Sequence, residues 1–141
     1  YGGGDLFLEF LTKELQPWVD EKFRTHPYKV LAGHSFGGLF TIYSMMQHPG
    51  AFQSYIALSP SLGRNSYQQV KIAGTFFKSE NTFPKSLFIT IGNEGGYTYN
   101  GSKKLADVLD TYAKDKFRFK FEELKEESHT SITTQGFIEG L

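Results

Sequence analysis

The chain has 141 residues, enough for one domain with a sizeable core. Its 15 basic and 15 acidic residues cancel, and no apolar run is long enough to cross a bilayer, so neither nucleic acid nor a membrane is an expected partner. The absence of cysteine excludes disulfides, cysteine-ligated zinc and a thiol nucleophile.

The first segment is predicted to be helical from Asp5, a suitable N-cap after three glycines, to about Phe23. Pro17 predicts a kink or a new turn within it. The chain begins at Tyr1, with neither an initiator methionine nor a signal-peptide pattern, which is typical of the middle of a longer chain or of a chain whose N-terminal part has been cleaved. Apolar residues at helical spacing are expected to share one face of this segment: Leu8, Leu11, Leu15 and Trp18.

Strands then alternate with helices along the rest of the chain. We expect strands over 28–32, 52–58, 86–92 and 116–124, and helices over 36–48, 66–79, 102–114 and 131–141. Loops are expected over 81–85 and over the Gly/Tyr-rich stretch 93–101. The last strand alternates phenylalanine with charged residues, as a half-exposed edge strand does. This order predicts an α/β fold with a mainly parallel sheet and flanking helices, in one compact unit.

Residues 33–37, Gly-His-Ser-Phe-Gly, fit G-x-S-x-G, in which a serine stands on a sharp turn between a strand and a helix. Such a turn exposes a weakly nucleophilic hydroxyl to a base and to a substrate carbonyl. We expect strained backbone at Ser35, and a collision with neighbouring chain for a Cβ at Gly33 or Gly37. The N–H of Phe36, at the helix N-terminus, is predicted to stabilise an oxyanion. The alternative is a glycine-rich connection with an incidental serine.

A serine nucleophile needs a base, and four histidines are available. His34 is expected to pack or hydrogen-bond locally, His48 ends the helix after Ser35, and His26 lies at the wrong edge of the sheet. His129 follows the last strand, at the edge where the carboxyl ends of parallel strands form sites. We therefore predict that His129 is the base; the alternative is a solvated loop histidine.

Glu94 is the predicted acid that orients His129, because it follows the strand over 86–92 and lies between Ser35 and His129 in the chain. Glu126 and Glu127 are nearer to His129 in sequence and are expected to solvate the loop. A Ser–His pair without a tight acid is the competing arrangement.

Three further residues are candidates for substrate binding. Ser61 and Arg64 follow the second strand at the same edge of the sheet, and Tyr97 lies beside Glu94. Each has an alternative role, as part of a structural loop or as a cover for the core. No metal site or cofactor is expected, because no two histidines have ligand spacing.

Five blocks of the sequence together resemble the putative esterase family of α/β-hydrolases, which includes esterase D-like enzymes and enterochelin (siderophore) esterases. The blocks are residues 5–11 (DLFLEFL), 27–38 (PYKVLAGHSFGG), 59–62 (SPSL), 92–96 (GNEGG) and 128–129 (SH). The resemblance covers nearly all of the chain. It implies that Ser35 is the nucleophile, His129 the base and Glu94 the acid, although some members use a Ser–His pair.

The family's domain is roughly twice as long, and its first strands precede the segment that begins at Tyr1. The resemblance therefore implies that 1–141 is the C-terminal part of a single α/β-hydrolase domain, without the N-terminal strands and the loop that donates a second oxyanion N–H. We expect an exposed apolar sheet edge that the N-terminal half or a second copy of the chain covers, and poor activity for 1–141 alone.

These observations predict a serine hydrolase that cleaves carboxylic esters of small molecules through an acyl-enzyme intermediate. The alternatives are a non-catalytic α/β-hydrolase-like binding module and an acyltransferase with the same nucleophile. Siderophore esters, simple acyl esters, thioesters and feruloyl esters all remain open as substrates.

Overall fold

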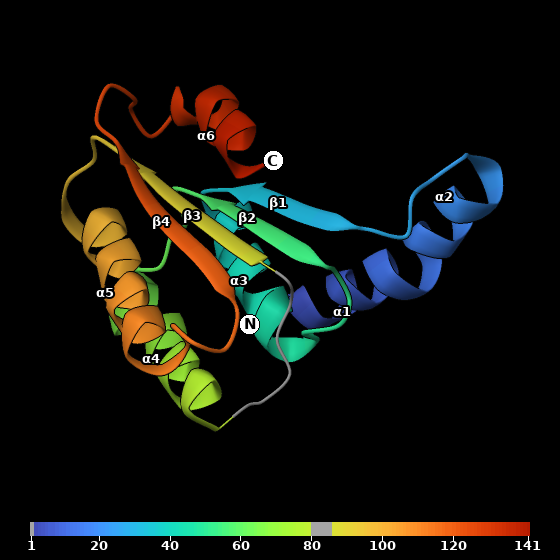
Figure 1. Ribbon diagram of the computed structural model, residues 1–141, viewed down its shortest axis with the longest axis horizontal. Helices are drawn as coiled ribbons and strands as arrows, with labels where there is room; N and C mark the ends of the chain where they lie inside the picture. Colours follow the sequence, from blue (N-terminus) through green and yellow to red (C-terminus); the bar gives the residue numbers. More distant parts are fainter. Residues whose placement is uncertain (1, 80–85) are drawn as a thin grey trace.

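A computed structural model describes residues 2–79 and 86–141. Within this part of the chain, four strands form one sheet in the order β1-β2-β3-β4, and each strand pairs in parallel with the next (Figure 1). The predicted parallel sheet is confirmed; the loop expected over 81–85 lies outside the described residues. The strands are β1 (Val30–His34), β2 (Ser54–Leu58), β3 (Ser86–Gly92) and β4 (Arg118–Leu124).

Three helices connect consecutive strands and cover one face of the sheet, and a fourth covers the other face (Figure 1). Crossovers of one hand that always step to the next strand leave their helices on the same side. Side chains of β2 alternate accordingly: Tyr55 and Ala57 enter the main core, whereas Ile56 and Leu58 face the single helix. The connecting helices are α3 (Phe36–Gln47), α4 (Arg64–Ser79) and α5 (Gly96–Tyr112), and the single helix is α6 (Ile132–Gly140).

α6 lies against the sheet through glycines. A Cβ at Gly136 would come within 2.9 Å of the methyl carbon of Thr90, and one at Gly140 within 2.8 Å of the ring of Phe88. These two positions let the helix backbone approach β2 and β3 directly. The end of the chain thereby holds the loop between β4 and α6, which carries His129, close to the sheet.

The predicted N-terminal helix is present as α1 (Gly4–Glu9), a π-helical stretch η1 (Phe10–Leu15) and α2 (Gln16–Lys22). It is capped by Gly3 at φ 69° rather than by Asp5, whose carboxylate accepts a hydrogen bond from the hydroxyl of Tyr43. The wider π-helical turn stands directly before Pro17, which has no N–H and whose ring crowds the preceding turn.

The apolar residues that were expected to share one face of this segment differ widely in exposure. Leu8 is 1% exposed, but Leu15 and Trp18 are 36% and 52% exposed. The reason is position, because α2 extends beyond the sheet on the side of β1 (Figure 1). The exposed apolar residues of this region form what we call the N-terminal apolar surface: Leu6, Phe7, Phe10, Leu15, Trp18, Phe23 and Val30.

Val30 is 38% exposed and belongs to β1, which is an outer strand of the described sheet. The expectation of an exposed apolar sheet edge is therefore confirmed for the described part of the chain.

Across residues 2–79 and 86–141, every helix falls short of the length and hydrophobicity that crossing a bilayer requires.

α5 begins six residues earlier than the sequence predicts, at Gly96 instead of residue 102. One of the glycines that favoured a loop serves packing instead: a Cβ at Gly101 would lie 2.8 Å from the backbone nitrogen of Gly63. α5 therefore crosses the loop after β2 at backbone contact distance. α4 also begins differently, because Asn65, Ser66 and Tyr67 form a left-handed turn before the regular helix.

Candidate active site

Ser35 occupies the sharp turn between β1 and α3, with φ 57° and ψ −112°. The strained conformation expected for this residue is confirmed. Its N–H donates to the carbonyl of Leu58 at 2.9 Å, and its carbonyl accepts from the N–H groups of Leu39 at 3.0 Å and Ser61 at 3.1 Å. Hydrogen bonds to β2, to α3 and to the loop after β2 therefore hold the strained backbone on both sides.

The glycines of the turn differ from the sequence prediction in one respect. A Cβ at Gly33 would lie 2.2 Å from the carbonyl oxygen of Gly37, so the collision expected there is confirmed. The collision expected at Gly37 is wrong, because among the described residues no atom beyond its own helix turn lies within 4 Å of a Cβ at that position. Gly38 is the helix glycine in close contact, because a Cβ there would lie 3.0 Å from both the carbonyl oxygen of Leu58 and the Cα of Pro60.

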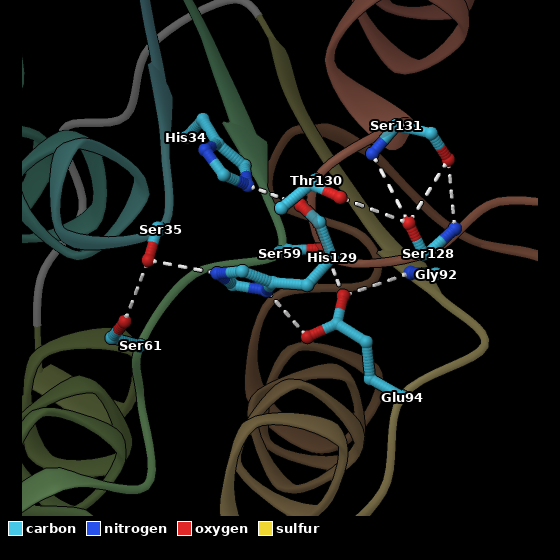
Figure 2. A network of polar contacts seen from close by, with 10 residues as sticks. All are labelled: His34, Ser35, Ser59, Ser61, Gly92, Glu94, Ser128, His129, Thr130 and Ser131. Carbon is cyan, nitrogen blue, oxygen red and sulfur yellow. Dashed lines mark hydrogen bonds and ion pairs between the residues drawn. The ribbon is translucent and has the colours of Figure 1, made fainter.

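His129 and Glu94 meet Ser35 at the carboxyl edge of the sheet (Figure 2). His129 Nε2 lies 3.0 Å from Ser35 Oγ, and His129 Nδ1 lies 2.6 Å from Glu94 Oε2. Because the carboxylate accepts, Nδ1 carries the proton and Nε2 presents its lone pair to the serine hydroxyl. The structure thus brings together the three residues predicted from sequence, from the ends of β1 and β3 and the loop after β4.

Glu94 uses both of its carboxylate oxygens. Oε1 accepts hydrogen bonds from the hydroxyl of Ser59 and, at 3.3 Å, from the N–H of Gly92. The side chain of Glu94 is only 8% exposed, whereas that of His129 is 38% exposed. Ser59 is a contact that the sequence did not identify, because its proximity to Glu94 depends on the pairing of β2 with β3.

The loop that carries His129 is held from both sides. The N–H of Asn93 donates to the carbonyl of Glu127 at 2.6 Å, and the N–H of Ile132 donates to the carbonyl of Ser128 at 3.1 Å. A Cβ at Gly92 would lie 2.6 Å from the same Glu127 carbonyl, so the end of β3 passes the loop at close range. The rival acid Glu126 is exposed on this loop.

The remaining histidines lie as expected, with one correction. His48 caps the C-terminal end of α3, and His26 accepts a hydrogen bond from the N–H of Tyr28 ahead of β1. His34 was expected to interact locally, and this is wrong. Its Nε2 lies 2.6 Å from the backbone carbonyl oxygen of His129, and the two imidazole centroids are 4.7 Å apart.

The three candidate substrate-binding residues line one hollow. Ser61, Arg64 and Tyr97 surround a space of about 300 Å³ together with Gly63 and Thr98. Ser61 Oγ is 3.3 Å from Ser35 Oγ, so one residue that lines this hollow contacts the candidate nucleophile. Tyr97 projects from the first turn of α5 rather than from the loop predicted there.

A second hollow of about 450 Å³ shares Arg64 with the first. Phe36 lines it, and the guanidinium carbon of Arg64 lies 4.7 Å from the centroid of that ring. Tyr43 also lines it; burial, and then the carboxylate of Asp5, raise the pKa of Tyr43 to about 12. The hollow therefore presents a neutral phenol. Residues 2–5 form part of its wall, and no sequence motif predicted that they would line a cavity.

A parallel sheet with a serine, a carboxylate and a histidine placed in that chain order at its carboxyl edge is the arrangement of an α/β-hydrolase fold. The chain belongs to the Putative esterase family, whose sequence profile matches residues 1–131.

Two curated relatives and one solved structure illustrate the similarity. Ferri-bacillibactin esterase BesA of Bacillus subtilis is 27% identical over 139 residues, which are 94% of this chain and 48% of the relative. Siderophore triacetylfusarinine C esterase of Aspergillus fumigatus is 29% identical over 114 residues, 79% of this chain and 39% of the relative. The crystal structure of the BES protein from Bacillus cereus superposes with a TM-score of 0.85 at 29% identity, covering 99% of this chain and 53% of that protein.

The chain therefore spans about half the length, or less, of the relatives that it matches. The described sheet corresponds to part of their α/β-hydrolase fold.

Proposed function

We propose that the protein is a serine esterase that cleaves carboxylic esters of small molecules through an acyl-enzyme intermediate. One observation supports this most strongly: the continuous hydrogen-bonded chain from Ser35 through His129 to the buried carboxylate of Glu94. A serine beside an oriented imidazole has the means to lose its proton as it attacks. Membership of an esterase family agrees with that chemistry.

In the proposed acylation step, Ser35 Oγ attacks the ester carbonyl carbon and its proton passes to His129 Nε2. The carbonyl oxygen becomes an oxyanion, which the N–H of Phe36 stabilises because the first N–H groups of α3 have no acceptor within the helix. Glu94 stabilises the imidazolium through Nδ1. Collapse of the intermediate breaks the bond to the alcohol, which leaves with the proton from Nε2.

The second half of the reaction repeats these steps with water. His129 Nε2 takes a proton from water as the hydroxide attacks the acyl carbon, and the same N–H of Phe36 holds the new oxyanion. Release of the acid returns the proton to Ser35. Each turnover therefore consumes one ester and one water and restores the resting tautomer of His129.

We assign substrate binding to the hollow lined by Ser61, Arg64 and Tyr97, because the side chain of Ser61 contacts that of Ser35. Arg64 also lines the second hollow and places a positive charge between the two spaces. Since the curated relatives are named as siderophore esterases, siderophore esters are the first substrates to test, followed by simple acyl esters.

We further propose that residues 1–141 form the C-terminal part of a single esterase domain. Two observations support this proposal: the open edge at β1 with the N-terminal apolar surface beside it, and the partial coverage of the relatives. The rest of the domain, or a second copy of the chain, would cover this surface. A chain with the complete domain is then expected to be far more active than residues 1–141 alone.

The test is hydrolysis of p-nitrophenyl butyrate by a chain that carries the complete domain. Ser35→Ala should abolish turnover and labelling by a fluorophosphonate probe, whereas the matched control Ser79→Ala, on the exposed side of α4, should retain both. Labelling at Ser35 with acyl transfer to an added alcohol in place of hydrolysis would indicate an acyltransferase. Full turnover by Ser35→Ala would refute the assignment, and a folded protein that is never labelled would be a binding module.

A further inference from the structure

We propose that His34 is a positioning residue for His129: it holds the backbone of the candidate base while Glu94 orients its ring. This inference rests on the proposed role of His129. It is carried by the 2.6 Å contact between His34 Nε2 and the carbonyl oxygen of His129, across 95 positions of the chain. Figure 2 shows the two imidazoles on either side of that contact.

The contact defines the protonation of His34. A backbone carbonyl only accepts hydrogen bonds, so Nε2 of His34 must carry the proton and donate it. His129 has the opposite arrangement, with its proton on Nδ1 and a lone pair on Nε2 directed at Ser35. The two imidazoles therefore adopt different tautomers, each selected by the acceptor that it faces.

His34 is well placed to act as a fixed reference. It is the last residue of β1 and pairs in register with Leu58 of β2, so its backbone belongs to the sheet. Its neighbour in the chain is Ser35. Two hydrogen bonds therefore join the same two segments and form a closed ring of contacts. One links Ser35 Oγ to the imidazole of His129, and the other links the backbone carbonyl of His129 to the imidazole of His34. The peptide bond between His34 and Ser35 closes the ring.

The ring of contacts explains how a loop residue keeps a hydrogen-bonding distance of 3.0 Å to Ser35. The neighbouring hydrogen bonds of the loop, at Glu127 and Ser128, fix it relative to β3 and α6, but not relative to the strand that carries the serine. His34 supplies that missing connection. Its ring also lies against the ring of His129, with the centroids 4.7 Å apart.

Three variants of the complete domain test the proposal with p-nitrophenyl butyrate. His34→Leu replaces the imidazole with a side chain of similar size that cannot donate a hydrogen bond, and should lower kcat about 10- to 100-fold with KM nearly unchanged, as expected for a misplaced base. His34→Gln places an amide N–H at the same number of bonds from the backbone and should recover most of that loss. The matched control is His48→Leu, because His48 is exposed and lies at the far end of α3, directly after its last residue.

Wild-type kcat for His34→Leu, or equal losses for the leucine and glutamine variants at the wild-type melting temperature, would overturn the proposal. If His34→Leu does not fold, nitrogen-15 NMR of the histidine rings in the unmodified protein decides. A proton on Nε2 of His34 supports the proposal, and an Nδ1–H tautomer with a bare Nε2 contradicts it. Full activity of Ser35→Ala would instead remove the proposed function itself, so the two failures are distinguishable.

Discussion

Glu94→Gln is the sharpest test of how the candidate site works, because it changes one atom of a side chain that is not expected to touch the substrate. Oε2 of Glu94 lies 2.6 Å from His129 Nδ1, and the side chain is 8% exposed. The amide keeps the size of the carboxylate and, with its oxygen at the Oε1 position, the contacts to Ser59 and Gly92, but its NH2 group then faces Nδ1 of His129. It removes the negative charge that faces the imidazolium formed during attack.

The expected loss follows from that charge. Two unit charges about 4 Å apart interact with roughly 4 kcal/mol at an effective dielectric constant of about 20, the value suited to a partly buried site. In the proposed mechanism His129 takes up its second proton during the attack, so this interaction is gained only as the transition state forms. A loss of roughly 4 kcal/mol from the transition state corresponds to about a thousandfold in kcat/KM. The charge is lost from the transition state, so kcat should fall by at least the same factor, because the amide NH2 also disfavours the Nδ1–H tautomer of His129 that the attack requires.

The assay is steady-state hydrolysis of p-nitrophenyl butyrate by the complete domain, with thermal unfolding as a check on the fold. Glu126→Gln is the matched control, because Glu126 is exposed on the neighbouring loop and is expected to leave kcat within twofold. A Glu94→Gln variant with kcat within threefold of the wild type would show that a Ser–His pair suffices and that the electrostatic reasoning is wrong. A thousandfold loss in Glu126→Gln would move the acid to that residue.

Two further predictions concern the fold. Gly33→Ala should destabilise the protein by about 3 kcal/mol or more in urea unfolding, since its Cβ would lie 2.2 Å from a backbone oxygen. Gly37→Ala should stay within about 1 kcal/mol of the wild type, and equal losses in both variants would contradict the packing described at the turn. At alkaline pH, the fully buried Tyr55 should weaken the fold, because burial raises its pKa from 10.0 to about 12. The phenol stays neutral in the folded state while the unfolded state ionises, so stability is retained below pH 10 and falls by roughly 2 to 3 kcal/mol as pH rises to about 12. The free energy of unfolding of Tyr55→Phe should therefore fall less between pH 10 and 12, by roughly 2 to 3 kcal/mol, than that of the wild type. The same pH dependence in both proteins would exclude Tyr55 as the source of the loss.

The sequence by itself determined the features that depend on local pattern. The apolar run over 86–92 gives β3 the bounds predicted, and the alternation of Phe119 and Phe121 with charged neighbours marks β4 as an edge strand. The strained turn at Ser35 was predictable because only a few short motifs place a serine between a strand and a helix. His129 was found by elimination, since parallel strands bring their carboxyl ends to one edge. The catalytic roles of these residues stay predictions that the variants above test.

The tertiary structure alone decided which surfaces and atoms meet. The leucine spacing of residues 5–23 predicted a shared apolar face, but burial of such a face needs a packing partner, and α2 extends past the sheet so that Trp18 is 52% exposed. Gly101 carries no sign that it allows α5 to pass Gly63, because the contact joins segments that are distant in sequence. The hydrogen bond from His34 to the carbonyl of His129 could not be predicted from the sequence for the same reason. Residue periodicity and short motifs predict the secondary structure of the segment that contains them. Contacts between segments that are distant in sequence depend on how the strands pair and the helices pack, which only the folded structure shows.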